Sequence, residues 1–372
     1  MSDLPETSRR IRSLVNAEGQ VEVSLETQPL PQPRDGQVLV RVEAAPLNPS
    51  DIAVLLAGAD VSAGRREGDA LVAPLPDGAA SMLTSRVGQP SIVGNEGSGV
   101  VVATGAGAEH LAGKTVAFLG GGAYADYRVV PAMMAMELPD GTDPRDGASC
   151  FVNPLTALGM VETMRREGHT ALVHTAAASN LGQMLVKICQ EDGVGLVNVV
   201  RRQEQADILT AIGAEHVVVS SADSYRDDLA AAVTATGATL GFDAIGGGKT
   251  ASELLMAMET ALIANGAPAT GYGTSVHKQV YVYGGLDVGP IVINRKFGFS
   301  WSLGGWLLTP FLGTLSLEEH VRLRGRVVAG LTTTFASSYT DEVSLEGMLD
   351  PATAQAYARQ ATGSKYLVRP QT

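Results

Sequence analysis

From Pro154 onward, short apolar strands alternate with segments long enough to form helices. The predicted strands are Ala171–His174, Gly195–Val200, His216–Val219, Gly241–Ala244 and Val280–Tyr283, and the clearest helices are Leu181–Glu191 and Gln203–Ile212. This order is typical of a parallel sheet that is covered by helices on both faces. Ligands of such sheets bind beyond the carboxyl ends of the strands. The sequence therefore predicts an α/β domain of the Rossmann type over residues 151–327.

The first 150 residues have a different pattern, in which strands predominate. The predicted strands are Ile11–Val15, Val21–Leu25, Val38–Val42, Ile92–Val102 and Thr115–Leu119. Between them, Gly58–Gln89 is mixed in polarity, and we expect a long surface excursion or flap rather than a packed unit. Since 372 residues are many for one hydrophobic core, we predict two domains. A β-rich catalytic domain would comprise residues 1–150 and be completed by residues 328–372.

Charge and cysteine content exclude several classes of partner. The formal net charge of -12 would repel nucleic acid and anionic membrane surfaces, so neither is an expected partner. Cys150 and Cys189 are the two cysteines, too few for a disulfide framework or a four-thiolate zinc site. Met1–Arg10 lacks the apolar core of a secretion signal, and the apolar Trp301–Leu315 is too short to span a bilayer. We expect a soluble cytoplasmic protein.

The first predicted strand of the α/β domain leads into a candidate dinucleotide-binding turn, His174–Gln183. In such a turn, glycines let the backbone amides and the helix N-terminus face a pyrophosphate. Gly182 is the one glycine here, and Ala176 and Asn180 occupy positions where glycine is usual. An ordinary strand-to-helix turn with Ser179 as its N-cap fits the same residues. Both interpretations stay open on this segment alone.

Two arginines follow the second strand of this domain. An acidic side chain at this position would bind the ribose hydroxyl of NAD, whereas the chain has Arg201 and Arg202. Guanidinium groups pair well with phosphate, which indicates the 2′-phosphate of NADPH. The alternative is a solvated basic pair that opens a helix. Glycine-rich exits also follow the fourth and fifth strands, at Phe242–Gly248 and Tyr283–Leu286, and each could be a simple tight turn.

The order of five motifs resembles the medium-chain dehydrogenase/reductase superfamily, and specifically its zinc-free quinone oxidoreductase and enoyl reductase branch. The motifs are Val38–Asp51 with its Asn-Pro-x-Asp ending, Val93–Val100, Gly122–Tyr127, Asn153–Gly159 and Thr362–Val368. The resemblance covers nearly the whole chain. It implies a GroES-like β-rich catalytic domain beside the Rossmann-type domain, NADPH as cofactor, and a homodimer formed around Lys296–Gly305.

The resemblance also implies the site residues. The candidates for holding a substrate oxygen are Asn48, Tyr124 and Asn153, although packing against a glycine bend is an alternative role for Tyr124. Asp51 is expected to cap or orient its loop. The expected cofactor-binding residues are Thr156, Ala178, Ser179, Asn180, Leu181, Gly182, Arg201, Arg202, Ile245, Tyr283, Gly284 and Lys365.

No metal is expected. Zinc-dependent relatives place Cys, His and Cys at the positions that Asn48, Asn95 and Asn153 occupy here, and an amide is a poor ligand for Zn²⁺. Without a Lewis acid, hydride transfer suits a quinone or an α,β-unsaturated carbonyl compound, whose conjugation spreads the charge. Residues 52–60 contain no tyrosine that could donate a proton, which favours a proton from water or no protein acid at all.

Two other functions remain open at this stage. An enoyl-thioester reductase would need a basic channel for the phosphates of coenzyme A, to which Arg65, Arg66 and Arg86 could contribute. A cofactor-binding protein without catalytic activity is the second alternative.

Overall fold

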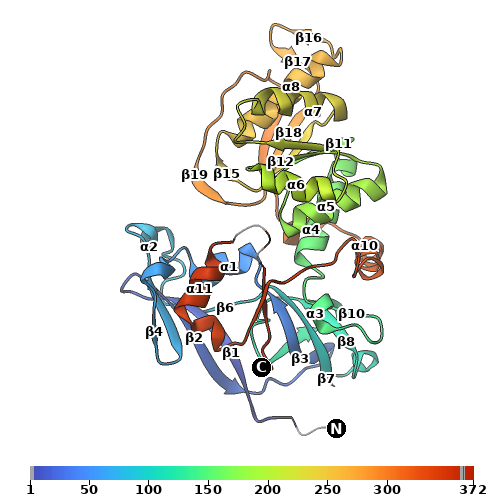
Figure 1. Cartoon of the computed structure of the whole chain (residues 1–372). Coiled ribbons are helices and arrows are strands. Elements are labelled where there is room, and N and C mark those ends of the chain that lie inside the picture. The colour runs from blue at the N-terminus through green and yellow to red at the C-terminus, as the bar shows by residue number, and fades with distance from the viewer. Residues whose placement is uncertain (1–3, 361–362, 364) are drawn as a thin grey trace. The chain divides into compact units, whose positions relative to one another are not determined.

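The computed structural model describes residues 4–360, 363 and 365–372 of the chain (Figure 1). It divides into two compact units, Met1–Val152 with Arg326–Thr372, and Asn153–Gly325. Each unit has its own sheets and its own core, and each is described by itself below.

The second unit is built on a six-stranded sheet in the order β13-β12-β11-β14-β18-β20. Every neighbouring pair in this sheet is parallel. The strands are β11 (Ala171–Thr175), β12 (Gly195–Val200), β13 (His216–Val219), β14 (Leu240–Asp243), β18 (Lys278–Val282) and β20 (Trp301–Gly305). The predicted α/β fold is thus confirmed, and β12 and β13 have the predicted bounds.

Helices cover both faces of this sheet because the strand order reverses at β11. The helices are α4 (Val152–Arg166), α5 (Asn180–Asp192), α6 (Gln203–Ala211), α7 (Tyr225–Thr236), α8 (Thr250–Ala264), α9 (Leu308–Leu312) and α10 (Leu317–Ala329). With right-handed crossovers, α5 and α6 fall on one face, and α7 and α8 fall on the other. Figure 1 shows α7 and α8 side by side, and their buried faces share one core with Val173, Val197 and Val280.

Four short strands lie outside this sheet. They are β15 (Gly246–Gly248), which pairs with β19 (Asp287–Ile291), and β16 (Ala269–Thr270), which pairs with β17 (Gly273–Thr274). The segment from Tyr283 to Val292 is attached to the loop after β14 by a backbone hydrogen bond, in which the amide of Asp287 donates to Ile245 O at 2.8 Å. This pairing places the glycine-rich exits of β14 and β18 next to each other.

The first unit contains two antiparallel-rich sheets. The first has the order β4-β5-β2-β1-β6, and its strands are β1 (Thr7–Val15), β2 (Gln20–Pro29), β4 (Arg65–Glu67), β5 (Ala70–Pro74) and β6 (Ser91–Ile92). The second has the order β10-β8-β7-β3-β22-β21 with β9 also on β3, and its strands are β3 (Gln37–Pro46), β7 (Glu96–Thr104), β8 (Thr115–Leu119), β9 (Tyr127–Pro131), β10 (Ala135–Glu137), β21 (Asp341–Val343) and β22 (Tyr366–Val368). Its helices are α1 (Pro49–Leu56), α2 (Ala79–Met82), α3 (Pro144–Gly147) and α11 (Pro351–Ala358).

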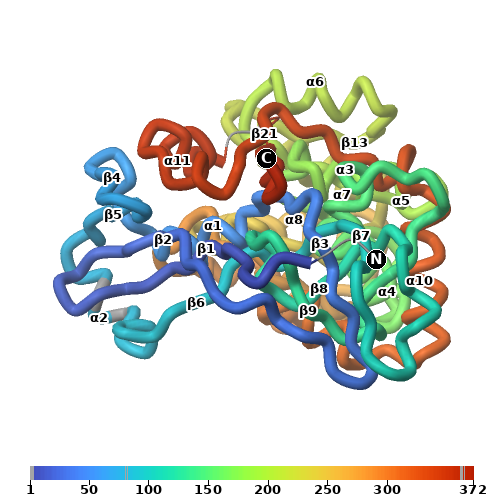
Figure 2. Tube along the Cα trace, turned by 90° about the horizontal axis from the view of Figure 1, so that it is seen from below, coloured from blue at the N-terminus to red at the C-terminus, as the bar shows by residue number. Residues whose placement is uncertain are grey.

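Two sequence predictions for this unit need correction. The stretch Ile92–Val102 is not one strand, because residues 93–95 separate β6 from β7. Part of Gly58–Gln89 is packed rather than a flap: β5 pairs with β2 in antiparallel register, and Leu71, Val72 and Ala73 are buried. Figure 2 shows β4 and β5 running beside β2. The apolar Leu-Val-Ala run therefore extends the sheet, a signal that the mixed polarity around it obscured.

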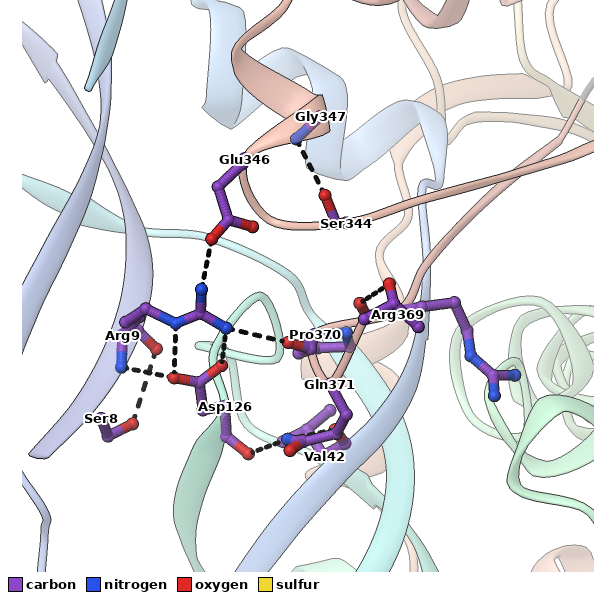
Figure 3. A network of polar contacts seen from close by, with 11 residues as sticks. Ser8, Arg9, Val42, Asp126, Ser344, Glu346, Gly347, Arg369, Pro370 and Gln371 are labelled. Atoms are coloured by element: carbon purple, nitrogen blue, oxygen red, sulfur yellow. Dashed lines mark hydrogen bonds and ion pairs between the residues drawn. The ribbon is translucent and has the colours of Figure 1, made fainter. Parts of the chain in front are cut away.

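The C-terminal residues are tied to the N-terminal strand by a polar network (Figure 3). The guanidinium of Arg9 donates to Asp126 Oδ1 at 2.9 Å, to Glu346 and to the carbonyl of Pro370. Gln371 Nε2 donates to the carbonyl of Asp126 at 2.8 Å. These contacts join residues far apart in sequence, and they explain how the last 47 residues complete the first unit.

Within the described residues, no helix has both the length and the apolar composition that crossing a membrane requires. The apolar Trp301–Leu315 forms β20 and the short helix α9 instead.

Candidate active site

The turn between β11 and α5 has the features of a dinucleotide-binding turn. Ser179 is the N-cap of α5, and its Oγ accepts a hydrogen bond from the amide of Gly182 at 3.1 Å. A Cβ on Gly182 would lie 2.0 Å from Ala177 O, so only glycine fits there. Ala176 takes the left-handed conformation, with φ of 52°. This conformation explains why glycine is usual at position 176. Here an alanine adopts it instead, and the chain continues into α5.

Several predicted cofactor-binding residues share this turn. Ala178 and Leu181 are buried, whereas Ser179 and Asn180 are partly exposed at the N-terminus of α5. Because the first amides of a helix have no partner within the helix, this end favours an anionic group. The turn thus offers backbone donors and a shape that matches a pyrophosphate.

Arg201 and Arg202 follow β12 directly and are exposed. The side chain of Gln205 accepts from both of their backbone amides, at 3.0 and 3.2 Å, and so fixes the backbone that carries them. Neither guanidinium forms an ion pair or hydrogen bond with any residue that the structure describes. Two cations are therefore held at the carboxyl end of the strand next to β11.

Sequence reasoning missed a buried carboxylate at the end of β14. Asp243 Oδ1 accepts from Thr175 Oγ1 at 2.8 Å and from the amide of Ile245 at 2.9 Å, and Thr175 Oγ1 accepts from the amide of Ala244. Burial raises the pKa of Asp243, and these hydrogen bonds partly offset the effect. The network locks the ends of β11 and β14 together. An acidic residue at the end of an apolar strand was the available signal.

The predicted cofactor residues beyond β14 and β18 lie in crossing loops. A Cβ on Gly284 would lie 2.6 Å from Ala244 O, so the two loops touch backbone to backbone. The side chain of Tyr283 points elsewhere, toward β11: its hydroxyl is 2.7 Å from His174 Nε2, and the two rings stack at 5.7 Å between centroids. This contact favours a packing role for the Tyr283 side chain over direct binding of a cofactor.

His174 is fully buried, and burial lowers its pKa to about 3. Its Nδ1 and the Oδ1 of Asn198 have no hydrogen-bond partner among the described residues. The two residues are Cα partners on β11 and β12.

In the first unit, Glu96 organises a buried polar cluster. Its Oε1 accepts from Asn48 Nδ2 at 2.8 Å, and its Oε2 accepts from the amides of Phe151 and Val152 at 2.8 and 2.9 Å. Burial raises the pKa of Glu96, and the charge of Lys365 opposes this shift. Glu96 thus orients the Asn48 amide and anchors the last residues before α4. Glu96 lies within the Val93–Val100 motif, which by itself indicates no role for this residue.

Asp51 has the capping role that the sequence indicates. One carboxylate oxygen accepts from the amide of Asn48 at 3.0 Å and the other from the amide of Asn95 at 2.7 Å. Burial raises its pKa to about 7 despite these hydrogen bonds. The carboxylate connects the start of α1 to the loop before β7.

The predicted role of Tyr124 as a donor to substrate is not supported by its position. Tyr124 is fully buried, and its hydroxyl donates to Pro46 O at 2.9 Å. A hydroxyl has one proton to donate, so this hydrogen bond occupies it. The contact favours the alternative of core packing, and we leave Tyr124 out of the proposed catalytic group.

Lys365 lies beside the Glu96 cluster and was predicted to bind cofactor. Its Nζ donates to Ser149 Oγ at 2.7 Å. Burial lowers its pKa to about 8, and the charges of Glu96 and Asp51 oppose this shift. Thr362 and Ser364 of the same predicted motif lie outside the described residues.

Asn153 and Thr156 lie in the first turns of α4, in the second unit. Both are largely buried. Gly159, the last residue of the same motif, admits no side chain easily, because a Cβ there would lie 3.0 Å from the rings of Phe311 and Trp306. The motif therefore fixes the packing of α4 as well as the position of its polar residues.

The residues at the positions of zinc ligands do not fit zinc. Asn48 Nδ2 donates to Glu96, and Asn95 Nδ2 donates to Ser50 Oγ at 3.1 Å. Amide groups bind Zn²⁺ poorly compared with thiolate and imidazole. Among the described residues, no three His, Cys, Asp or Glu side chains come together in a way that could hold a metal ion.

Comparison with known proteins connects both units to one family. The model of the alcohol dehydrogenase GroES-like domain matches residues 34–140. The crystal structure of a Mesorhizobium loti protein named as an NADPH:quinone reductase has a TM-score of 0.74 and 26% identity, covering 99% of this chain and 100% of that one.

Both units thus resemble the medium-chain dehydrogenase/reductase superfamily. The superfamily resemblance predicted from the motifs is thereby confirmed.

Curated members of the superfamily match over shorter stretches. A zinc-type alcohol dehydrogenase-like protein of Schizosaccharomyces pombe is 25% identical over 221 residues, which are 56% of this chain and 59% of the relative. Prostaglandin reductase-3 of Mus musculus is 32% identical over 194 residues, which are 51% of this chain and 44% of the relative. The chain thus spans about half the length of these relatives.

Proposed function

We propose that this protein is an NADPH-dependent reductase that transfers hydride to a quinone or an α,β-unsaturated carbonyl compound without a metal ion. The observation that carries the proposal is the nucleotide half-site. Gly182 lies at the start of α5, where a side chain would collide with Ala177 O, and two guanidinium groups with no ion pair to any described residue lie at the end of the neighbouring strand. The name of the Mesorhizobium loti relative agrees with this class of reaction.

The chain's own residues have distinct parts in this proposal. The amides at the start of α5 would hold the pyrophosphate, and Arg201 and Arg202 would bind the 2′-phosphate. Bound NADPH supplies the hydride. In the first unit, Glu96 orients the amide of Asn48, which remains our proposed donor to the substrate oxygen together with Lys365. Donors aimed at an oxygen that gains charge stabilise the transition state.

Zinc chemistry is excluded from the proposal because the side chains at the positions of zinc ligands are amides, which bind Zn²⁺ poorly. The positions that hold ligands in zinc-dependent relatives have amides that already donate to Glu96 and Ser50. A chain of this kind must stabilise negative charge with hydrogen bonds and an ammonium group. Conjugated acceptors, whose charge is delocalised, suit such a site best.

The contacts of Arg65, Arg66 and Arg86 do not favour the enoyl-thioester alternative. Arg65 pairs with Glu67 at 2.5 Å, Arg66 donates to Gly68 O, and Arg86 donates to Val54 O. Each of the three guanidinium groups thus interacts with a nearby residue of the same unit. They do not line a common basic channel.

The test is steady-state NADPH oxidation, followed at 340 nm, with a panel of quinones, enones and enoyl thioesters. We expect turnover with a quinone or an enone, and faster turnover than with any enoyl thioester. Turnover of thioesters alone would reassign the substrate. NADPH binding without turnover of any acceptor would support the non-catalytic alternative.

A further inference from the structure

A chain of hydrogen-bonded side chains extends from Lys365 within the first unit. Lys365 Nζ donates to Ser149 Oγ at 2.7 Å, and Ser149 Oγ is 2.9 Å from the hydroxyl of Tyr339. Ser149 is 2% exposed, whereas Lys365 and Tyr339 are both partly exposed. A buried hydroxyl therefore connects two half-buried side chains.

The backbone holds the two ends of this chain in register. The strands β21 and β22 are parallel neighbours, and their pairing begins at Asp341 and Tyr366. The amide of Thr340 donates to Lys365 O at 2.9 Å. Lys365 directly precedes Tyr366, and Tyr339 directly precedes Thr340, so the backbone holds the two residues close together although 26 positions separate them in sequence.

Two cations hold the ring of Tyr339. Lys365 Nζ lies 5.5 Å from the ring centroid, and Arg145 Cζ lies 5.4 Å from it. Arg145 in turn donates to Glu342 on β21 at 3.0 Å. The phenol is thereby oriented so that its hydroxyl meets Ser149, independently of any ligand.

The charges that face Lys365 come from several elements. Glu96 on β7 and Asp51 on α1 favour the ammonium form, while burial favours the neutral amine. Arg145 on α3 and the thiol of Cys150 lie near Tyr339. These opposing effects lower the pKa of Lys365 to about 8, so that it can both lose and regain a proton near neutral pH.

We propose that Lys365, Ser149 and Tyr339 form a proton relay that completes reduction of the substrate, with Lys365 as the catalytic residue and the other two as positioning residues that resupply it. The inference rests on the proposed reductase function. It gives the chain a proton donor where residues 52–60 contain no tyrosine. It also revises the expectation that the proton comes directly from water.

After hydride has reached the acceptor, the acceptor needs one proton on the oxygen or carbon that gained charge. The N–H bond of the Lys365 ammonium breaks as the new O–H or C–H bond forms, which leaves a neutral amine. The amine takes a proton from Ser149 Oγ, the serine takes one from Tyr339 Oη, and the tyrosine takes one from water.

The experiment compares Ser149→Ala, Tyr339→Phe and Lys365→Met with wild type, using an enone that wild type reduces. Tyr339→Phe keeps the ring between its two cations and removes only the hydroxyl. We expect Ser149→Ala and Tyr339→Phe to lower kcat about tenfold or more, with an unchanged KM for NADPH and a larger solvent deuterium isotope effect. Lys365→Met should lose about a hundredfold in kcat, and added methylammonium should restore part of it. Tyr272→Phe, on an exposed tyrosine of the second unit, is the matched control and should behave as wild type.

A second measurement needs neither NADPH nor turnover. Reductive ¹³C-methylation labels the lysines, and Lys365→Met assigns the signal of residue 365. We expect the Lys365 signal to titrate below the range of the other lysines, and Ser149→Ala to lower its midpoint further, because the ammonium loses its acceptor. A Lys365 signal that titrates with the others would contradict the relay.

The relay and the proposed function fail in different ways. Wild-type protein that reduces enones while Ser149→Ala and Tyr339→Phe keep its kcat and isotope effect would overturn the relay alone. Wild-type protein that reduces no acceptor would overturn the proposed function and the relay with it. A loss in Lys365→Met that appears only in the KM for NADPH would assign Lys365 to cofactor binding instead.

Discussion

At the scale of single residues, the proposed nucleotide-binding side chains and Tyr124 differ in what determines their positions. Arg201, Arg202, Ser179 and Gly182 follow from strand and helix positions, because their roles depend on local backbone and charge. Tyr124 illustrates the opposite case. Whether its hydroxyl faces a substrate or Pro46 O depends on a contact 78 residues away, which no local pattern encodes.

The arginine pair yields a test of cofactor choice. Arg201→Ala combined with Arg202→Ala should raise the dissociation constant for NADPH about tenfold or more, since each charge-assisted contact contributes roughly 1.5–3 kcal/mol. NADH lacks the 2′-phosphate, so its dissociation constant should hardly change. Titration of nucleotide fluorescence measures both constants. Arg226→Ala, which removes an exposed arginine of α7, is a control that should leave them unchanged. Equal weakening of both nucleotides would remove the arginines from phosphate recognition.

His174 makes stability depend on pH. Its pKa is about 3 in the folded chain and near 6.5 when exposed, so the unfolded chain takes up a proton that the folded chain excludes. The contribution of His174 to the free energy of unfolding should therefore fall as pH drops from 6.5 toward 3, by at most about 1.4 kcal/mol per pH unit. Urea unfolding of His174→Gln should show a shallower decline over this range. His110→Gln, at an exposed histidine, should keep the wild-type slope. Identical slopes for wild type and His174→Gln would show that His174 does not carry this effect.

At the scale of elements, the parallel sheet was the most predictable part. Its central strands β11 and β12 are mostly apolar and almost fully buried, as expected of strands covered on both faces, and β12 and β13 match their predicted bounds. In the first unit, β8 also matches its predicted bounds. The segment Gly58–Gln89 was less predictable, since β5 is stabilised by pairing with β2, some 50 residues earlier in the sequence. Lys365 was predicted from the sequence as a cofactor-binding residue, but its contact with Ser149 and Tyr339 was not predicted, because it joins three segments that are far apart in sequence.

The β11–α5 turn should be intolerant of a side chain at position 182. In Gly182→Ala, the new Cβ would lie 2.0 Å from Ala177 O, so the start of α5 must shift. We expect a lower midpoint of thermal unfolding and weaker NADPH binding, because the amides that face the pyrophosphate move with the helix. Calorimetry and nucleotide titration check the two effects. Gly325→Ala, in the helix α10 with open space around its Cα, should be neutral or slightly stabilising.

At the scale of the whole molecule, the oligomeric state remains a prediction. The strand β20 pairs with β18 on one side and ends the sheet, and the exposed Phe299 and Leu307 flank it. An apolar sheet edge of this kind favours pairing with a second copy. Light scattering should give twice the chain mass of 38.6 kDa. Phe299→Asp with Leu307→Asp should give monomers, whereas Val321→Asp, on an exposed valine of α10, should not. A monomeric wild type would contradict this prediction.

The central claim is that hydride passes from NADPH to a conjugated carbonyl compound on a protein without zinc. The most direct test is a single-turnover reaction of zinc-quantified protein with NADPH that carries deuterium on the transferable position of C4, followed by mass spectrometry of the product. The account predicts one deuterium on the β-carbon of the reduced enone and far less than one zinc per chain. Unlabelled product, or activity that requires stoichiometric zinc, would contradict it.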